Sequence, residues 1–208
     1  FQRLIENYPE NSKLQEALLR YGEISYKIGD YSNSVKALKR LTQKTADPSI
    51  KEAGLFYLAR SLERMQKPKE AETYYRQIRD ISKTGDYAAY ATFLLADLLA
   101  KQDKTKQAIA LYNELWQEYD AFRLAADDEL VKEAQLQAAQ MLYQQDRFGE
   151  ASKAYQAYIQ NASEPEMVAK AKYGAAWSEY RQKNYSQALE IAESLQRQSL
   201  PPELAAGI

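Results

Sequence analysis

The chain has 208 residues, 45% of them hydrophobic and 27% charged, so it has enough apolar surface to bury a core. Glycine (7) and proline (6) are scarce, and helix-forming Ala, Leu, Gln, Lys and Glu dominate, which favours an all-α fold. The net charge of −1 gives no basic excess of the kind that indicates nucleic-acid binding, and the absence of Cys and His excludes thiol nucleophiles, disulfides, imidazole bases and the usual zinc sites.

Apolar residues recur at the helical period along the whole chain, separated by turn and capping residues. All six prolines fall between these segments or in a first helical turn, where proline is tolerated. Asp30, Ser49, Asp86, Asp103 and Ser163 are placed to cap helix starts. The predicted helices span 1–8, 12–28, 31–45, 49–66, 68–83, 86–102, 105–119, 125–145, 148–161, 165–183 and 185–199, and a further helix starts at 202.

A segment that contains a turn and then a small residue recurs five times. The small residue stands at positions 34, 71, 108, 151 and 188, so the steps are 37, 37, 43 and 37 residues. A second small residue lies twelve residues before each: Gly22, Ala59, Ala96, Ala139 and Ala176. Four residues after each come Leu38, Tyr75, Tyr112, Tyr155 and Ala192. Each unit is therefore predicted to be a helix–turn–helix hairpin in which the small residues let two helices approach closely.

The longer third step contains six extra residues, between Tyr119 and Val131. They are expected either to lengthen the next helix or to form a longer loop.

These residues resemble the tetratricopeptide repeat, whose usual unit has 34 residues, and the resemblance covers essentially the whole chain. It implies an all-α solenoid of about five helix–turn–helix repeats that form a right-handed superhelix. We expect residues 1–208 to be a single array with partial repeats at both ends. Because the chain opens at Phe1 inside a predicted helix, we also expect it to be a fragment of a longer protein.

Units that end in Phe-x-x-Leu…Tyr-Pro, as Phe1 to Leu4 and Tyr8–Pro9 do, resemble those of bacterial envelope proteins. These include the lipoprotein of the outer-membrane β-barrel assembly machine, the Tol-Pal-associated cell-division coordinator and scaffolds of exopolysaccharide export. The resemblance implies a periplasmic or outer-membrane-associated location and leaves a cytoplasmic one open. No apolar run approaches the roughly 20 residues that a membrane span needs, so no span is expected in this chain.

Without His and Cys, the candidates for catalysis are paired carboxylates, Lys and Tyr. Asp127, Asp128 and Glu129 form the densest acidic cluster, but they lack the alternating ligands and turn glycine of a calcium loop. The cluster is better explained by the helix dipole, which favours acidic residues at a helix N-terminus, than by a metal site. No glycine-rich phosphate loop is present. We therefore expect no enzymatic activity, no cofactor and no metal site.

The resemblance implies that ligands bind on a concave surface lined by the first helix of each hairpin. Some family members hold a C-terminal carboxylate with a clamp of Lys and Asn. This clamp is absent here, because apolar residues such as Leu19 and Phe56 stand at its positions. Aromatic and basic residues at the other groove positions are typical of interaction hot spots. The predicted partner-binding residues are Tyr26, Lys27, Phe56, Arg60, Arg64, Tyr90, Phe93, Lys101, Tyr143, Tyr173, Trp177 and Arg181.

The predicted function is that of a non-enzymatic scaffold in a bacterial envelope assembly, which docks a peptide or helix segment of another protein in its groove. Nucleic acid is not expected as a partner. The alternative is a scaffold of exopolysaccharide export that contacts the secretion machinery or a glycan, on whose sugar rings the Tyr and Trp faces would stack.

Overall fold

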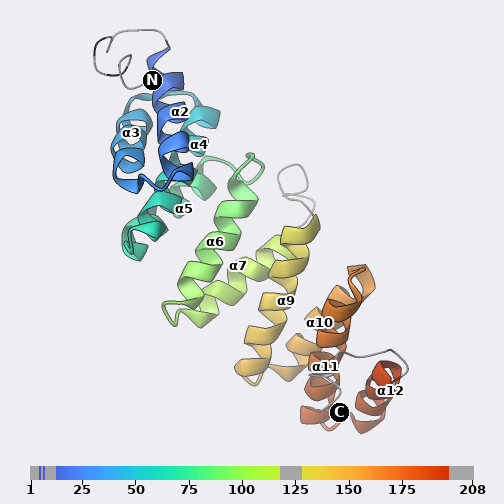
Figure 1. The fold of residues 1–208 in the computed structure, drawn as a ribbon. Coiled ribbons are helices and arrows are strands. Elements are labelled where there is room, and N and C mark those ends of the chain that lie inside the picture. Colours follow the sequence, from blue (N-terminus) through green and yellow to red (C-terminus); the bar gives the residue numbers. More distant parts are fainter. Residues whose placement is uncertain (1–4, 6, 8–12, 118–127, 197–208) are drawn as a thin grey trace. The chain divides into compact units, whose positions relative to one another are not determined.

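The computed structural model describes residues 5, 7, 13–117 and 128–196, and all regular structure in these ranges is helical (Figure 1). The labelled helices are α2 (Leu14–Lys27), α3 (Tyr31–Lys44), α4 (Pro48–Arg64), α5 (Pro68–Ile81), α6 (Ala88–Ala100), α7 (Thr105–Gln117), α9 (Asp128–Gln144), α10 (Phe148–Asn161), α11 (Pro165–Arg181) and α12 (Tyr185–Gln196).

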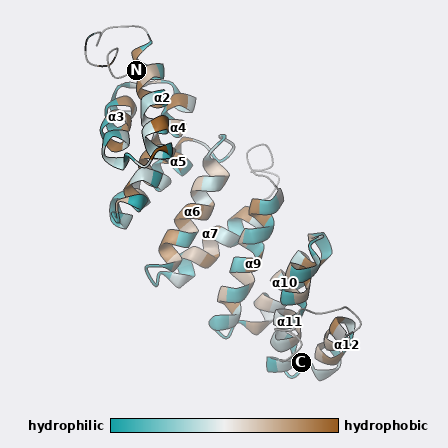
Figure 2. Cartoon of the chain, viewed as in Figure 1, coloured by the Kyte–Doolittle hydropathy of each residue, from teal (hydrophilic) through white to brown (hydrophobic). Residues whose placement is uncertain are grey.

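Each of these helices begins and ends within three residues of its predicted bounds, so the all-α prediction is confirmed. Hydrophilic and hydrophobic residues alternate along the helices (Figure 2), as the helical period in the sequence requires. Three predictions fall wholly or mainly outside the described residues. They are the helix over 1–8, of which only residues 5 and 7 are described, the six extra residues before Val131, and the helix start at 202.

The described helices group into two compact units. In unit 1, α2 packs on α3 and α4, α4 packs on α5, and α5 packs on α6. In unit 2, α7 packs on α9, and α9, α10, α11 and α12 each pack on the next. Within each unit every helix therefore contacts its neighbours in the chain, which is the packing pattern of stacked hairpins. The single array over 1–208 and its superhelix stay predictions.

Four of the five small residues on the first helices are buried as predicted. Gly22 is buried, and a Cβ atom added there would lie 2.4 Å from the Leu38 side chain of α3. The Ser34 hydroxyl donates a hydrogen bond to the Gly22 carbonyl oxygen at 2.8 Å, so the two small residues of this hairpin touch. Ala59, Ala96 and Ala139 are fully buried. Ala176 is only half-buried, because it lines an open hollow between α11 and α12.

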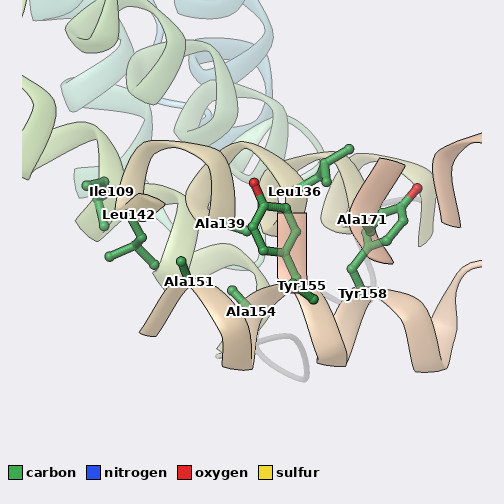
Figure 3. Close-up of a cluster of buried hydrophobic side chains, with 10 residues drawn as sticks. Ile109, Leu136, Ala139, Leu142, Ala151, Ala154, Tyr155, Tyr158 and Ala171 are labelled. Atoms are coloured by element: carbon green, nitrogen blue, oxygen red, sulfur yellow. The ribbon is translucent and has the colours of Figure 1, made fainter. Parts of the chain in front are cut away.

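Large side chains fill the space beside these contacts. In unit 2 a buried cluster combines Leu136 and Ala139 of α9 with Tyr155 and Tyr158 of α10 and Ala171 of α11 (Figure 3). Burial raises the pKa of Tyr155 to about 12, with a smaller contribution from Tyr143. Tyr155 is thus a neutral core residue rather than an ionisable surface group.

Of the three helix caps predicted in unit 1, one is observed and two are not. Asp30 caps α3 as predicted, by accepting a hydrogen bond from the Asn33 N–H at 3.2 Å. The prediction for Ser49 is wrong, because Pro48 is the first residue of α4 and Asp47 accepts from the Ser49 N–H at 2.9 Å. Asp86 does not cap α6. The Glu52 carboxylate of α4 caps it instead, by accepting a hydrogen bond from the Tyr87 N–H at 2.9 Å.

The other two predicted caps, Asp103 and Ser163, are wrong too. Asp103 has a left-handed backbone in the turn before α7, and the residue preceding α11 is Glu164, which makes no side-chain capping bond. The turn conformation itself repeats. Positive φ angles between 57° and 85° occur at Gly29, Gln66, Asp103, Asp146 and Lys183, with the same steps of 37, 37, 43 and 37 residues as the small residues.

Only the first of these five turns has glycine, so the other four hold a side chain in a conformation that L-residues disfavour. We expect Gln66→Gly to raise the free energy of unfolding by about 0.5–1 kcal/mol in urea denaturation, since relief of this strain outweighs the greater flexibility of the unfolded chain. The matched control is Gln77→Gly on the exposed face of α5, which should lower stability by about 1 kcal/mol. Equal loss of stability in both variants would contradict this account of the turn.

Replacement of Ala96 by Leu should overpack a position that has no exposed surface. We expect a loss of about 1–3 kcal/mol in the free energy of unfolding. Ala110→Leu on an exposed position of α7 is the control and should leave stability nearly unchanged. Wild-type stability of the Ala96 variant would refute the close helix approach.

Glu52 should make the stability depend on pH. It is buried, and desolvation raises its carboxyl pKa above the ordinary 4.5, although the Tyr87 N–H opposes the shift. The folded state therefore binds this proton more tightly than the unfolded chain, and the contribution of Glu52 to stability falls as pH rises from 4.5 through the folded pKa. The melting temperature of Glu52→Gln minus that of the wild type should rise over this window.

Glu150 provides a control of opposite sign, because its hydrogen bond from Arg147 lowers its pKa. Its contribution is present above the ordinary value of 4.5 and is lost as pH falls through the folded pKa. The melting temperature of Glu150→Gln minus that of the wild type should therefore fall as pH rises from the folded pKa of Glu150 to 4.5, which is below the window of Glu52. The same slope for both variants would contradict the assignment.

Candidate partner-binding surface

The predicted partner-binding residues lie on the first helices of the hairpins and divide between the two units. Unit 1 carries Tyr26, Lys27, Phe56, Arg60, Arg64, Tyr90, Phe93 and Lys101, and unit 2 carries Tyr143, Tyr173, Trp177 and Arg181.

In unit 1 the structure brings two predicted aromatic residues into one ring cluster. The Tyr26 ring lies 5.8 Å from that of Tyr57, and the Phe56 ring lies 4.7 Å from that of Tyr87. Tyr57 and Tyr87, 6.1 Å apart, join the two pairs. These four rings are half-buried, so each keeps part of its face accessible while the cluster holds its orientation. Tyr90 and Phe93 on α6 are also half-buried.

Three of the predicted cations of unit 1 are engaged within the chain. Lys27 pairs with Glu23 and Lys101 with Asp97, each at 2.7 Å and four residues apart on one helix. The Arg60 guanidinium lies 3.5 Å from the Glu63 carboxylate. The Lys27 and Lys101 side chains are exposed, and exposed pairs of this kind contribute little to stability, so these two lysines can exchange partners when a ligand arrives.

Arg60 and Arg64 differ in their surroundings. Arg60 is half-buried, and its partner Glu63 accepts a hydrogen bond from the buried hydroxyl of Tyr75, so this polar group links α4 to α5. Burial, reinforced by the Glu63 charge, holds the pKa of Tyr75 above its usual value, so that Tyr75 stays a donor. Arg64 is exposed and forms no ion pair with another described residue. Arg64 is therefore the cation of this set best placed to meet an acidic ligand group.

In unit 2, Arg181 is held in a local stack. Its guanidinium carbon lies 4.4 Å above the centre of the Phe148 ring, and Nη2 lies 3.3 Å from an Asp146 carboxylate oxygen. The Tyr143 ring packs edge-on against Phe148 at 5.3 Å. Two predicted residues, Tyr143 and Arg181, thus meet on the ring of Phe148, which is not among the predicted residues.

Four rings form a continuous row on α11 and at the start of α12. Tyr173 lies 6.2 Å from Trp177, Trp177 lies 5.5 Å from Tyr180, and Tyr180 lies 5.5 Å from Tyr185. Trp177, Tyr180 and Tyr185 are 40%, 52% and 58% exposed. We call these four residues the α11–α12 aromatic row.

The row borders two hollows in unit 2. One, of 340 Å³, is lined by Tyr143, Tyr155, Tyr173, Gly174 and Trp177. The other, of 420 Å³, is lined by Tyr173, Ala176, Trp177, Tyr180, Tyr185, Ala188, Leu189, Ala192 and Leu195. Both volumes fall in the range of about 300–1,000 Å³ that is usual for ligand sites, and both hollows share Tyr173 and Trp177.

Several residues of this surface are not among the predicted ones, above all Tyr57, Tyr87, Phe148, Tyr185 and Leu189. The family pattern assigns ligand contacts to particular first-helix positions, whereas Phe148, Tyr185 and Leu189 belong to second helices. The available signal was the aromatic or aliphatic character of these residues beside a turn, but the same character also marks core positions.

The acidic cluster considered for metal binding lies partly outside the described residues. Its member Glu129 is exposed in the first turn of α9 and lies 3.5 Å from Lys132. No group of three or more acidic side chains in the described ranges is arranged to hold a metal ion. In the same ranges, no helix is both long enough and apolar enough to cross a membrane.

Comparison with protein families decides the identity of the repeat. One tetratricopeptide repeat model matches residues 56–134 and 136–201, and another tetratricopeptide repeat model matches residues 16–44. The chain belongs to the tetratricopeptide repeat family. No curated protein sequence matches the chain.

Solved structures of tetratricopeptide repeat proteins share the fold at low sequence identity. MamA protein is 16% identical, with a TM-score of 0.67 over 90% of this chain and 92% of that one. BtubC (BKLC) from P. vanneervenii is 15% identical, with a TM-score of 0.65 over 94% and 84%. A Podosopora anserina protein with nearly identical TPR-like repeats is 14% identical, with a TM-score of 0.62 over 90% and 96%.

The tetratricopeptide fold is that of a protein–protein interaction scaffold, and proteins of this family are generally non-enzymatic. The aromatic clusters of both units therefore lie on a fold that presents side chains for binding.

Proposed function

We propose that this tetratricopeptide chain docks a segment of a partner protein on the first-helix surface of its repeats. The observation that carries the proposal is the α11–α12 aromatic row, in which Trp177, Tyr180 and Tyr185 are exposed although the four rings hold one another in edge-on contact. Rings already fixed in place offer a large contact area and lose little side-chain entropy on binding.

The charges support a partner segment with both apolar and acidic residues. The hollows at the row are lined mainly by aromatic and aliphatic side chains, which suit apolar anchors. Arg64 is exposed on unit 1. Lys27, the last residue of α2, and Lys101, which directly follows α6, are exposed on the same unit. Cations at such positions attract acidic groups and increase the rate of encounter.

The proposed setting is a bacterial envelope assembly, with the chain in the periplasm or at the outer membrane. Its support is the likeness of Phe1 to Pro9 to the units of envelope proteins. Fractionation of source cells with an antibody against the chain tests this location, and recovery of the protein in the cytoplasmic fraction would contradict it.

Glycan binding in exopolysaccharide export is the second candidate. The exposed faces of Trp177, Tyr180 and Tyr185 suit stacking on sugar rings. The 420 Å³ hollow beside them is poor in polar groups that could bind sugar hydroxyls, which favours a protein ligand. Calorimetric titration with acidic and neutral oligosaccharides separates the two, since the glycan hypothesis requires saturable binding that Trp177→Ala removes.

Selection of a phage-displayed peptide library on the whole chain tests the proposed function. We expect recovered peptides to lose at least about 30-fold in affinity for Trp177→Ala, which corresponds to about 2 kcal/mol for a central hot spot. Arg64→Glu should mainly slow association and weaken its dependence on salt, because charges at the rim of an interface act through steering.

Lys153→Glu is the matched control, because Lys153 is exposed on α10 and belongs to neither hollow that the row borders. It should bind the selected peptides as the wild type does. Loss of binding in this control, with normal binding in Trp177→Ala and Arg64→Glu, would place the ligand on the second-helix surface and refute the proposal.

A further inference from the structure

The 340 Å³ hollow in unit 2 lies between the first helices α9 and α11, and we call it the α9–α11 hollow. Its lining residues are Tyr143, Tyr155, Tyr173, Gly174 and Trp177. α9 and α11 contact each other less than the first helices α2 and α4 of unit 1 do, which leaves this space open. Four of the five lining residues are aromatic and none carries a charge, so a ligand here meets ring faces and the polar atoms of Tyr and Trp.

The floor of the α9–α11 hollow is the side chain of Tyr155 from α10, which is only 5% exposed. A Cβ atom added at Gly174 would collide with the ring carbon that carries the Tyr155 hydroxyl, so this end of the side chain lies against the backbone of α11. Burial raises the pKa of Tyr155 to about 12. The hydroxyl therefore keeps its proton at neutral pH and can donate a hydrogen bond.

The Tyr155 hydroxyl lacks the acceptor that its counterpart has in unit 1. Tyr75 stands at the equivalent position of the α4–α5 hairpin and donates to the carboxylate of Glu63. In the α9–α10 hairpin Tyr143 takes the place of Glu63, since each stands four residues after the small residue of its first helix. Among the residues that the structure describes, none accepts a hydrogen bond from the Tyr155 hydroxyl. A buried donor of this kind favours a ligand that brings an acceptor.

The lining of the hollow favours an acceptor that is neutral and not already bonded. No lysine or arginine lines the hollow, so a carboxylate buried there would lack a counter-ion, which is costly. The backbone carbonyl oxygens of a helix are bonded within the helix, except in its last turn. An extended segment, in contrast, keeps its carbonyl oxygens free to accept a hydrogen bond.

Proline meets the other requirements of the α9–α11 hollow. It has no N–H group, so it leaves no donor without an acceptor among the rings. The polyproline II conformation has no internal hydrogen bonds, so its carbonyl oxygens are available to the Tyr155 hydroxyl. Proline-rich segments in this conformation dock in grooves lined by aromatic residues and lose little entropy on binding.

We propose that the α9–α11 hollow binds a proline-containing extended segment of a partner protein, and that the Tyr155 hydroxyl donates a hydrogen bond to a backbone carbonyl oxygen of this segment. This inference rests on the proposed function and names the class of its partner. It assigns Tyr143, Tyr173 and Trp177 as the rings that the proline contacts.

The helix contacts favour a partner over the chain's own residues after α12. First helices pack on the hairpin directly before them, since α4 contacts α2 and α3, and α11 contacts α9 and α10. A helix that followed α12 in this pattern would contact α11 and α12. Tyr143 and Tyr155 belong instead to the α9–α10 hairpin, on which α11 already packs.

Binding of a labelled decaproline peptide to the whole chain, measured by fluorescence anisotropy, tests the inference. We expect decaproline to bind at least about 10-fold more tightly than a glycine–serine peptide of equal length. A lactam-stabilised helical peptide of equal length should bind as weakly as the glycine–serine peptide. Trp177→Ala should lower the affinity for decaproline at least about 10-fold, because it removes one wall of the hollow.

Tyr155→Phe removes the hydroxyl and keeps the ring. It should lower the affinity for decaproline about 3- to 10-fold, which is the loss of one hydrogen bond. It should not lower the melting temperature, because no described residue accepts this bond. Tyr75→Phe is the matched control. It should bind decaproline as the wild type does but melt at a lower temperature, because Glu63 loses its donor.

The double variant Pro201→Ser, Pro202→Ser tests the chain's own pair of adjacent prolines as the occupant. We expect this variant to bind decaproline as the wild type does. A gain in affinity of about 3-fold or more would show that these prolines compete for the hollow, and it would overturn the assignment to a partner.

Other results would also overturn the inference. They are equal affinity for decaproline and the glycine–serine peptide, tighter binding of the helical peptide, or normal affinity for decaproline in a folded Tyr155→Phe variant. Calorimetric binding of an oligosaccharide that Tyr155→Phe weakens, without binding of decaproline, would assign the hollow to a glycan instead.

Failure of this inference and failure of the proposed function give different results. If library peptides bind through Trp177 and Arg64 but contain no proline and do not depend on the Tyr155 hydroxyl, only the inference fails. If the library yields no binder while decaproline binds through Tyr155 as expected, the general docking surface fails and the α9–α11 hollow stands.

Discussion

The close approach of two helices at small residues is the contact on which the rest of each unit depends. Where Gly22 meets Leu38, and where Ser34 donates to the Gly22 carbonyl oxygen, no larger side chain fits between the helices. This approach fixes the spacing within a hairpin, and the larger residues, such as Tyr75 and Tyr155, are then directed between successive hairpins. The size of one residue in each helix therefore decides where the aromatic residues can pack.

The same packing separates two roles among aromatic and charged residues. The second-helix tyrosines Tyr75 and Tyr155 are buried, and burial raises the pKa of each hydroxyl, so both stay neutral. First-helix rings such as Phe56 and Trp177 keep part of their faces accessible. Arg60 shows that the two roles overlap. It lies on a first helix at a predicted groove position, but it pairs with Glu63, which accepts a hydrogen bond from Tyr75 of α5. A basic residue at a groove position is thus not by itself a ligand contact.

The 420 Å³ hollow between α11 and α12 follows from an exception to the packing rule. Ala192 stands where three earlier hairpins have tyrosine, and the exposed row of rings lies directly beside it. A scaffold built from near-identical units acquires a distinct site where one unit departs from the pattern in size. The departure here is the loss of one aromatic ring, which leaves a shaped apolar hollow without disturbing the two helices that form it.

The sequence by itself determined the helical fold, the hairpin repeat and nearly all helix bounds, because apolar periodicity and small residues at a fixed step depend only on positions along the chain. It also placed the four buried small residues and the candidate aromatic residues on first helices. The tertiary structure alone decided that Glu52 caps α6, that Phe148 carries Arg181, and that Tyr185 and Leu189 complete the site around Trp177. Each of these contacts joins residues from different helices, and their distances are set by how the hairpins pack rather than by spacing in the sequence.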